Sequence, residues 1–233
     1  MRVFIILPAA GIGTRMAAAG AAAPKQFLEL GGEPILIHSL KAFAGVPAVT
    51  QILVAVRPQE MERVHQQIEA AGLGSRIRVV EGGENRQGSV ANALAALDCA
   101  DDDIVLVHDA VRPLIDGATI ERTISAVQKH GAAIVGVPAI DTIKQVERTA
   151  EGAIITSTIP RERIVLAQTP QGATAGRMKK AFAEAEADGF AGTDEASLLE
   201  RAGMEVAVVA GSPRNFKITQ PGDLELAEFY LEH

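Results

Sequence analysis

The chain has 233 residues, with 22 Lys and Arg against 29 Asp and Glu, so its formal net charge is −7. A content of 48% hydrophobic and 22% charged residues is typical of globular proteins and excludes a disordered or fibrous chain. The acidic balance disfavours broad binding to nucleic acids or anionic membranes, because such surfaces recruit Lys and Arg.

Short apolar runs, many of them β-branched, predict the strands of a parallel sheet. They are continuously apolar rather than alternating, as expected of strands that are buried on both faces. In chain order, the predicted strands are Val3–Leu7, Gln51–Val56, Ile77–Glu81, Asp103–His108, Ala132–Pro138 and Glu205–Ala210.

Longer segments with helical periodicity lie between and after these runs. The predicted helices are Pro34–Phe43, Gln59–Ala71, Gly88–Leu97, Ala118–His130, Thr174–Ala187, Asp194–Ala202 and Pro221–Leu231. Gly72, Gly131 and Gly203 follow three of them as C-terminal stops. Alternating strands and helices predict an α/β fold with a doubly wound, mostly parallel (Rossmann-like) sheet.

The alternation fails once, between Asp141 and Arg163, where there is no room for a strand–helix–strand unit. The polar run TIKQVERTAEGAIITSTIP predicts two strands that turn near Glu151-Gly152. Such a hairpin has little core of its own, so we expect a protruding β-arm that a partner subunit covers. A flexible surface excursion is the alternative.

The first predicted strand leads directly into the glycine-rich loop PAAGIGTRM, Pro8 to Met16. Loops of this kind bind phosphates through backbone N–H groups. The dinucleotide-binding fingerprint is incomplete, because Met16 occupies the third glycine position, and no Gly-Lys pair forms a Walker A motif. Arg15 and Lys25 add two cations, which together with bare backbone amides suit a triphosphate.

A second candidate site is VHDAVRP, Val107 to Pro113, at the carboxyl end of the fourth predicted strand. Because ligands collect at this end of the strands in open α/β sheets, we expect Asp109 to face the glycine loop. A single carboxylate facing a polyphosphate is typical of Mg²⁺ sites. Arg112 can bind a second anion bidentately, whereas His108 lacks a His or Cys at metal-ligand spacing and is expected to be a packed side chain.

These motifs occur in order along almost the whole chain. The glycine loop with Arg15 is followed by PKQF, GGENRQGSV, VHDAVRP, DTIK, QTPQ, TDEAS and NFKIT. In this combination the chain resembles the 2-C-methyl-D-erythritol 4-phosphate cytidylyltransferases of isoprenoid biosynthesis. Ribitol-5-phosphate cytidylyltransferases share several of the blocks, but their first loop typically reads Leu-Ala-Gly-Gly where this chain has Pro8-Ala9-Ala10-Gly11, and they lack the TDEAS form. A sugar-1-phosphate nucleotidylyltransferase and a catalytically inactive nucleotide-binding regulator are further alternatives.

The resemblance implies a nucleotidyltransferase fold in which residues 1–233 form a single domain and the arm, at about 141–163, serves dimerisation. It also implies a reaction in which CTP and methylerythritol phosphate give CDP-methylerythritol and pyrophosphate. Arg15 and Lys25 match the catalytic cations that stabilise the α-phosphate in the transition state. The nucleotide-binding positions that it implies are Pro8, Ala9, Ala10, Gly11, Gly13, Gly83, Glu84 and Ser89.

The resemblance also implies a site for the acceptor, methylerythritol phosphate. Its residues are Asp109, Arg112, Thr142, Arg161, Thr169 and Lys217, of which Thr142 and Arg161 come from the neighbouring subunit of a homodimer. Arg163 is a near rival of Arg161. Thr193, Asp194 and Glu195 are interpreted first as residues that cap a helix and complement its dipole.

The remaining predictions concern metal and compartment. Asp109 is the predicted ligand of Mg²⁺ or another divalent cation. The lone cysteine, Cys99, excludes an intramolecular disulfide and indicates a reducing compartment. No apolar run approaches the ~20 residues of a membrane-spanning helix. The first apolar stretch is interrupted by Pro8, Gly11, Gly13 and Arg15, so we expect no signal peptide. We therefore expect a cytoplasmic protein, and the acidic charge predicts no nucleic-acid or membrane partner.

Overall fold

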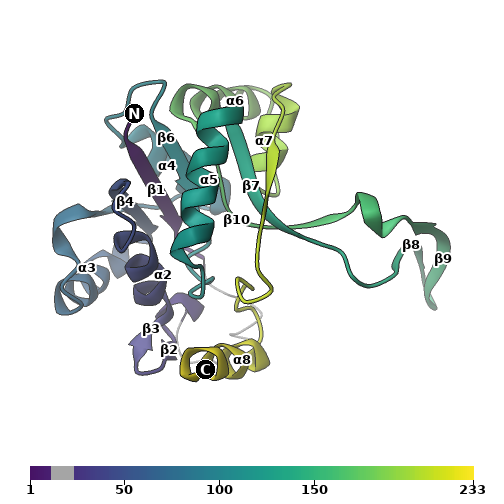
Figure 1. The fold of residues 1–233 in the computed structure, drawn as a ribbon, viewed down its shortest axis with the longest axis horizontal. Helices are drawn as coiled ribbons and strands as arrows, with labels where there is room; N and C mark the ends of the chain where they lie inside the picture. The colour runs from purple at the N-terminus through teal and green to yellow at the C-terminus, as the bar shows by residue number, and fades with distance from the viewer. Residues whose placement is uncertain (12–23) are drawn as a thin grey trace.

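A seven-stranded sheet forms the centre of the protein (Figure 1). The computed structural model describes residues 1–11 and 24–233. In spatial order the strands are β11 (Ala207–Ala210), β7 (Ala132–Pro138), β10 (Val165–Thr174), β6 (Ile104–Val107), β1 (Val3–Pro8), β4 (Val49–Val56) and β5 (Ile77–Glu81). β10 is antiparallel to both neighbours, and the other adjacent pairs are parallel. The mostly parallel, doubly wound sheet is therefore confirmed.

Helices cover both faces of this sheet. On one face, Val3, Ile5 and Leu7 of β1 belong to the core cluster that contains α2 (Ile35–Ala44), α3 (Met61–Ala70) and α5 (Gly117–His130). Phe4 and Ile6 belong to the opposite cluster, with α4 (Arg86–Ala95), α6 (Ala175–Ala187) and α7 (Glu195–Arg201). Both sets of β1 side chains are buried because β1 lies between two helical layers.

The predicted strands and helices all occur, with ends within two residues of the observed ones. Apolar runs and glycine stops are local signals, and the observed strands and helices follow them. Gly131, for example, ends α5 at φ 83°, a backbone region that favours glycine.

β10 was not predicted. Its sequence VLAQTPQGAT contains a proline and several polar residues, and a proline argues against a central strand because it cannot donate to the ladder. The pairing of β10 with β7 shifts register between Gln168 and Gln171, and Pro170 lies inside this irregularity. The bulge therefore admits Pro170 into a central strand and displaces Thr169 from the regular pairing.

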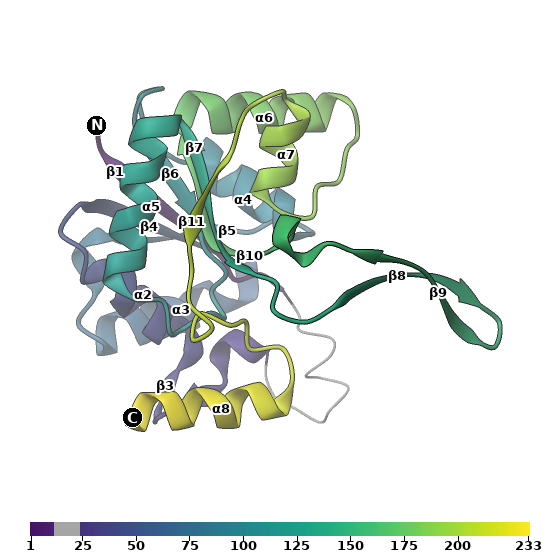
Figure 2. The same ribbon diagram turned by 45° about the vertical axis from the view of Figure 1, so that its right-hand side comes forward.

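The segment between β7 and β10 leaves the body as a two-stranded arm (Figures 1 and 2). β8 (Ile143–Thr149) pairs antiparallel with β9 (Gly152–Ile159), and the 3₁₀ helix η4 (Arg161–Arg163) follows. The protruding β-arm of the predicted fold is confirmed. Ile154 and Ile155 are 63% and 59% exposed, so the arm carries apolar side chains that its own chain leaves uncovered.

The C-terminal helix α8 (Pro221–Glu232) packs beside a small hairpin of β2 (Glu29–Leu30) and β3 (Glu33–Pro34). The helix was predicted, but the hairpin was not. A third apolar cluster, which includes Leu30, Val111, Ile218 and Ala227, joins them. This cluster fixes the strand-to-helix segment after β6 against the chain that precedes α8. Three further 3₁₀ helices are η1 (Lys25–Phe27), η2 (Pro58–Glu60) and η3 (Gly74–Arg76).

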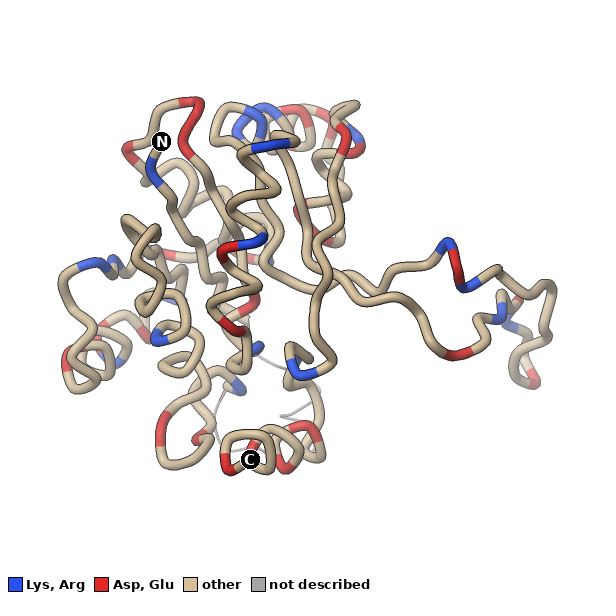
Figure 3. Tube along the Cα trace, viewed as in Figure 1, with Lys and Arg blue, Asp and Glu red and all other residues tan. Residues whose placement is uncertain are grey.

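Charged residues of both signs are interspersed over the described parts of the body and the arm (Figure 3). Among the described residues, no helix combines the length and apolar character needed to span a bilayer.

The close approach of β10 to β6 yields a stability prediction. A Cβ atom on Gly172 would lie 2.3 Å from the carbonyl oxygen of Val105 and 3.0 Å from the Cα atom of Leu106. Because backbone atoms cannot yield without opening the sheet, we expect Gly172→Ala to lower the free energy of unfolding by about 1–3 kcal/mol, measured by chemical denaturation. Gly222→Ala is the control, since a Cβ in α8 meets nothing within 4 Å and alanine favours a helix. Equal stability of the two variants would contradict this account of β10.

Candidate active site

The carboxyl ends of the parallel strands gather the predicted site at one edge of the sheet. Ile6 of β1 pairs with Val107 of β6, and Pro8 pairs with Ala55 of β4. The segments that follow β1 and β6 therefore emerge side by side, as expected for an open α/β sheet. The N–H of Ala9 continues this order by donating to the carbonyl of Ala55 at 2.7 Å.

A cavity of about 620 Å³, including the open space at its mouth, lies at this edge. The predicted site residues that line it are Pro8, Ala9, Ala10, Gly11, Lys25, Gly83, Glu84, Ser89, Asp109 and Lys217. The structure thus brings the predicted nucleotide-binding positions together with Lys25 and Asp109. Arg15 and Gly13 lie outside the described residues.

Gln26 is a lining residue to which the sequence analysis assigned no role. Its buried side chain donates from Nε2 to the carbonyls of Ala9, at 2.6 Å, and Gly11, at 3.2 Å. Both contacts fix the chain that leaves β1. The position of Gln26 in PKQF, next to Lys25, was the available signal.

The GGENRQGSV motif forms a tight loop that runs into α4. Asn85 caps this helix by accepting from the N–H of Gly88 at 2.8 Å, and Gly83 donates to the Ser89 hydroxyl at 3.1 Å. A Cβ on Gly83 would lie 2.6 Å from the carbonyl carbon of Gly88, so this approach requires glycine. The motif is a loop and helix start, and it also forms one wall of the cavity.

Asp109 is a buried carboxylate with three cationic neighbours. Its Oδ1 lies 3.1 Å from Nε of Arg86, and its Oδ2 lies 3.0 Å from Nζ of Lys217 and 3.2 Å from Nε of Arg112. Burial alone would raise the pKa of Asp109, but the positive charges of Arg86, Lys217 and Arg112 hold it well below its usual range. Asp109 is therefore ionised at neutral pH.

A second cavity, of about 470 Å³ with its mouth, lies on the other side of Asp109. Arg112 and Thr169 line it, together with Gln168, Gln171 and Asp194. Arg86, Asp109 and Lys217 line both cavities. The Asp109 carboxylate and two of its cations, Arg86 and Lys217, thus stand where the two cavities adjoin.

His108 is packed inside the protein, as predicted, and its hydrogen bonds fix its tautomer. Its Nε2 lies 3.1 Å from the carbonyl oxygen of Arg112, which can only accept, so Nε2 carries the proton. In the neutral ring Nδ1 then accepts from the Thr169 hydroxyl at 3.0 Å, and that hydroxyl accepts from the N–H of Asp109 at 3.1 Å. The Thr169 proton is directed at His108, and Thr169 holds the backbone at Asp109.

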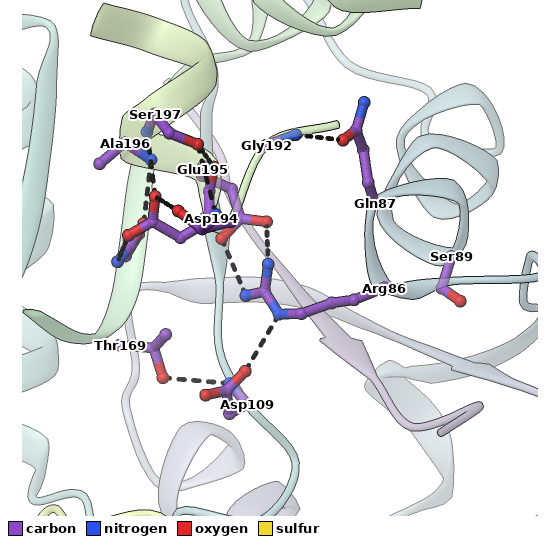
Figure 4. A network of polar contacts seen from close by, with 12 residues as sticks. Arg86, Gln87, Ser89, Asp109, Thr169, Gly192, Asp194, Glu195, Ala196 and Ser197 are labelled. Atoms are coloured by element: carbon purple, nitrogen blue, oxygen red, sulfur yellow. Dashed lines mark hydrogen bonds and ion pairs between the residues drawn. The ribbon is translucent and has the colours of Figure 1, made fainter. Parts of the chain in front are cut away.

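Arg86 and Glu195 were missed as site residues. NH1 and NH2 of Arg86 lie 2.7 and 2.9 Å from the two carboxylate oxygens of Glu195, whose side chain is 1% exposed (Figure 4). Glu195 stands in the first turn of α7, as the helix interpretation expected, but it points inward. Asp194 is the predicted cap, accepting from the N–H of Ser197 at 3.0 Å.

Two predicted acceptor residues lie apart from both cavities in their own chain. Thr142 precedes β8 and is exposed, and Arg161 lies in η4, where it donates to the carbonyl of Ile140 at 2.6 Å. Neither lines either cavity.

The burial of His108 predicts a pH dependence of stability. Burial lowers its pKa to about 4 from 6.5, so in this interval the unfolded chain binds a proton that the folded chain does not. Stability should therefore fall as the pH drops from 6.5 to 4, by about 3 kcal/mol for this one group. Denaturation of the protein and of His108→Gln across this interval measures the effect. The variant should show the weaker pH dependence, and parallel curves would contradict the buried neutral state.

Comparisons with known proteins identify the family of the chain. The family model described as 2-C-methyl-D-erythritol 4-phosphate cytidylyltransferase matches residues 3–233. A curated relative of that name from Acidobacterium capsulatum is 68% identical over 99% of this chain and 98% of its own. Another from Solibacter usitatus is 48% identical over 99% of this chain and 96% of its own.

Solved structures give the same result. The cytidylyltransferase of that name from Francisella tularensis is 36% identical, covers 98% of this chain and 99% of its own, and superposes with a TM-score of 0.81. The 4-diphosphocytidyl-2C-methyl-D-erythritol synthase from Anaerococcus prevotii is 28% identical over 100% of this chain and 96% of its own, with a TM-score of 0.85. The chain therefore belongs to the 2-C-methyl-D-erythritol 4-phosphate cytidylyltransferase family.

Proposed function

We propose that the protein transfers the cytidylyl group of CTP to 2-C-methyl-D-erythritol 4-phosphate in the synthesis of isoprenoid precursors. A phosphate oxygen of the acceptor bonds to the α-phosphorus of CTP while the bond from that phosphorus to the bridging oxygen breaks, which releases pyrophosphate and forms CDP-methylerythritol. The observation that carries the proposal is the pair of cavities that share Arg86, Asp109 and Lys217.

CTP would occupy the cavity between the glycine loop and the start of α4. The backbone of Pro8, Ala9 and Ala10, together with Gly83, Glu84 and Ser89, would recognise cytosine. Small residues there leave backbone donors and acceptors open to the base, and a hydrogen-bonding site rejects a wrong base because its own groups are left unpaired. Gln26 supports this role because it fixes the carbonyls of Ala9 and Gly11.

Lys25 and Arg15 would stabilise the negative charge that builds up on the α-phosphate in the transition state. Lys25 lines the nucleotide cavity from η1. A cation that is already in place is worth ~3–4 kcal/mol of transition-state stabilisation, which corresponds to a factor of ~10²–10³ in rate. The role of Arg15 rests on its place in the motif.

A divalent cation, Mg²⁺ in our proposal, would accompany the triphosphate, with Asp109 as its protein ligand. Within residues 1–11 and 24–233, no three His, Cys, Asp or Glu side chains gather into a metal cluster, so phosphate oxygens and water would supply most ligands, as Mg²⁺ prefers. Three cations contact Asp109, and the phosphates would supply the balancing charge. When bound, the ion would neutralise charge on the triphosphate.

The acceptor phosphate would bind in the second cavity, beside Arg112, Thr169 and Lys217. Arg161 and Thr142 would reach it from the arm of a second copy of the chain. The exposed Ile154 and Ile155 support a homodimer, because an uncovered two-stranded arm with apolar side chains is marginal in water.

The compartment that we propose is the cytoplasm. Cys99 is a free thiol, which fits a reducing environment. The interspersed charges of Figure 3 fit small-molecule substrates rather than a nucleic-acid or membrane partner.

The reaction is tested with purified protein, CTP, Mg²⁺ and one polyol phosphate at a time, with pyrophosphate release as the signal. We expect turnover with methylerythritol phosphate, loss of turnover in EDTA and recovery with added Mg²⁺. Preferred turnover of ribitol 5-phosphate would replace the proposed acceptor. Absence of turnover with every polyol phosphate, despite tight CTP binding, would favour a nucleotide-binding regulator.

The role of Lys25 predicts a particular kinetic defect. Lys25→Ala should lower kcat about 10²–10³-fold and change KM for CTP much less, because the cation acts mainly in the transition state. Lys41→Ala, which removes an exposed ion pair with Glu33, is the control and should keep normal kinetics. A rise in KM for CTP at unchanged kcat would remove the transition-state role.

The proposed dimer predicts complementation between two inactive variants. Arg161→Ala lacks the arm contact and Asp109→Ala lacks the central carboxylate, so each homodimer should be nearly inactive. A heterodimer has one site with both defects and one site with neither, so mixtures that exchange subunits should recover activity. Arg163→Ala, tested in the same way, distinguishes the two arginines of η4. No recovery in heterodimers verified by native mass spectrometry would place Arg161 in its own chain's site or outside the site.

A further inference from the structure

The contacts of Arg86 connect three parts of the site. Arg86 is the first residue of α4, directly after the loop that walls the nucleotide cavity. Its two terminal nitrogens face the two oxygens of Glu195, and its Nε faces Oδ1 of Asp109 at 3.1 Å (Figure 4). One guanidinium therefore joins α4, α7 and the end of β6.

The bidentate contact fixes the plane of the guanidinium. Two parallel N–H···O bonds leave a planar group little rotational freedom, so the direction of Nε–H toward Asp109 is set by where Glu195 stands. A lysine at this position would carry the charge without this directional fork.

Glu195 is itself held by the neighbouring β10. Gln171 of β10 donates to Oδ2 of Asp194 at 2.9 Å and accepts from the N–H of Ala196 at 3.0 Å. The residues on both sides of Glu195 are therefore tied to the central sheet, and the carboxylate is anchored well enough to orient Arg86.

The two oxygens of Asp109 have different partners. Arg112 and Lys217 both contact Oδ2, and Arg86 contacts Oδ1. Without Arg86, the attraction toward Oδ2 would be unopposed, and the carboxylate could turn toward those two cations. The orientation of Asp109 at the boundary of the cavities thus depends on Arg86.

We propose that Arg86 is a positioning residue that orients the Asp109 carboxylate between the two substrate cavities, and that Glu195 positions Arg86. Glu195 also accepts from both terminal nitrogens of Arg86, which keeps the guanidinium oriented with its Nε toward Asp109. The inference rests on the proposed reaction, since it assigns Asp109 to the meeting point of its two substrates.

The first test is Arg86→Lys, which keeps a positive charge beside Glu195. We expect a thermal midpoint close to that of the unsubstituted protein, kcat lower by about 10²-fold, and a nearly unchanged KM for CTP, because a misplacement of about 1 Å at a reacting centre has a cost of this order. A folded Arg86→Lys protein with normal kcat would overturn the proposal.

The second test separates positioning from stability. Arg86→Met should lower the thermal midpoint, because it leaves Glu195 buried without its partner. Adding Glu195→Gln removes the unpaired charge, so the double variant should regain stability while its kcat stays as low as that of Arg86→Met. If kcat returns together with the thermal midpoint, the pair is a purely structural contact and the proposal fails.

Gln87→Ala is the matched control. Gln87 follows Arg86 and joins the start of α4 to the segment before α7, accepting from the N–H of Gly192 at 2.9 Å and donating to the carbonyl of Phe190 at 3.2 Å. Neither contact involves Asp109, so we expect normal kcat. A fall in kcat equal to that of Arg86→Lys would attribute the effect to loosening of α4 and overturn the proposal. Lack of turnover in the unsubstituted protein would instead refute the proposed reaction.

Discussion

The buried charge of Asp109 is the constraint on which the site depends. An ionised carboxylate removed from water costs several kcal/mol unless cations and hydrogen bonds compensate for the lost hydration. The compensating groups come from separate segments: Arg86 starts α4, Arg112 follows β6, and Lys217 precedes α8. Keeping Asp109 ionised therefore requires these segments to lie close together. Two of the residues that they contribute, Arg86 and Lys217, form the boundary that the two cavities share.

The same arrangement prepares the site for anions. Before any substrate binds, Asp109 holds Arg86, Arg112 and Lys217 close together, although three cations alone would repel one another. In the proposed reaction two phosphates enter this region, and the cations are already in place, so little reorganisation accompanies the chemistry. The Glu195 carboxylate engages both terminal nitrogens of Arg86, whereas Lys217 lines both cavities and is placed to contact a phosphate in either one.

Sequence patterns revealed those parts of the fold whose signal is local. The continuous apolar run from Val3 to Leu7 predicts a strand, because burial on both faces of a sheet requires apolar residues at successive positions. β10 was not predicted because Pro170 and several polar residues, some of which line the second cavity, interrupt its apolar pattern. In addition, a local pattern cannot show that an antiparallel strand lies between β6 and β7. The site positions of Arg86 and Glu195 were not predicted for a different reason. They lie 109 positions apart, and each has an ordinary local interpretation at the start of its helix. The residues that line the first cavity could be predicted because the motifs that carry the family resemblance are distributed along the whole chain.

The arm carries both the exposed apolar side chains and the predicted acceptor residues that lie outside the cavities. Thr142 and Arg161, the two acceptor residues that the resemblance implies, lie outside both cavities of their own chain, at the base of a hairpin whose Ile154 and Ile155 are exposed. In the proposed homodimer, the body of a second copy would cover the apolar arm, and its second cavity would hold the phosphate that Arg161 contacts. Burying the hairpin and completing the anion site would then be one event, so dimerisation and acceptor affinity would be linked. A monomer would be expected to bind CTP in its own cavity but to hold methylerythritol phosphate weakly.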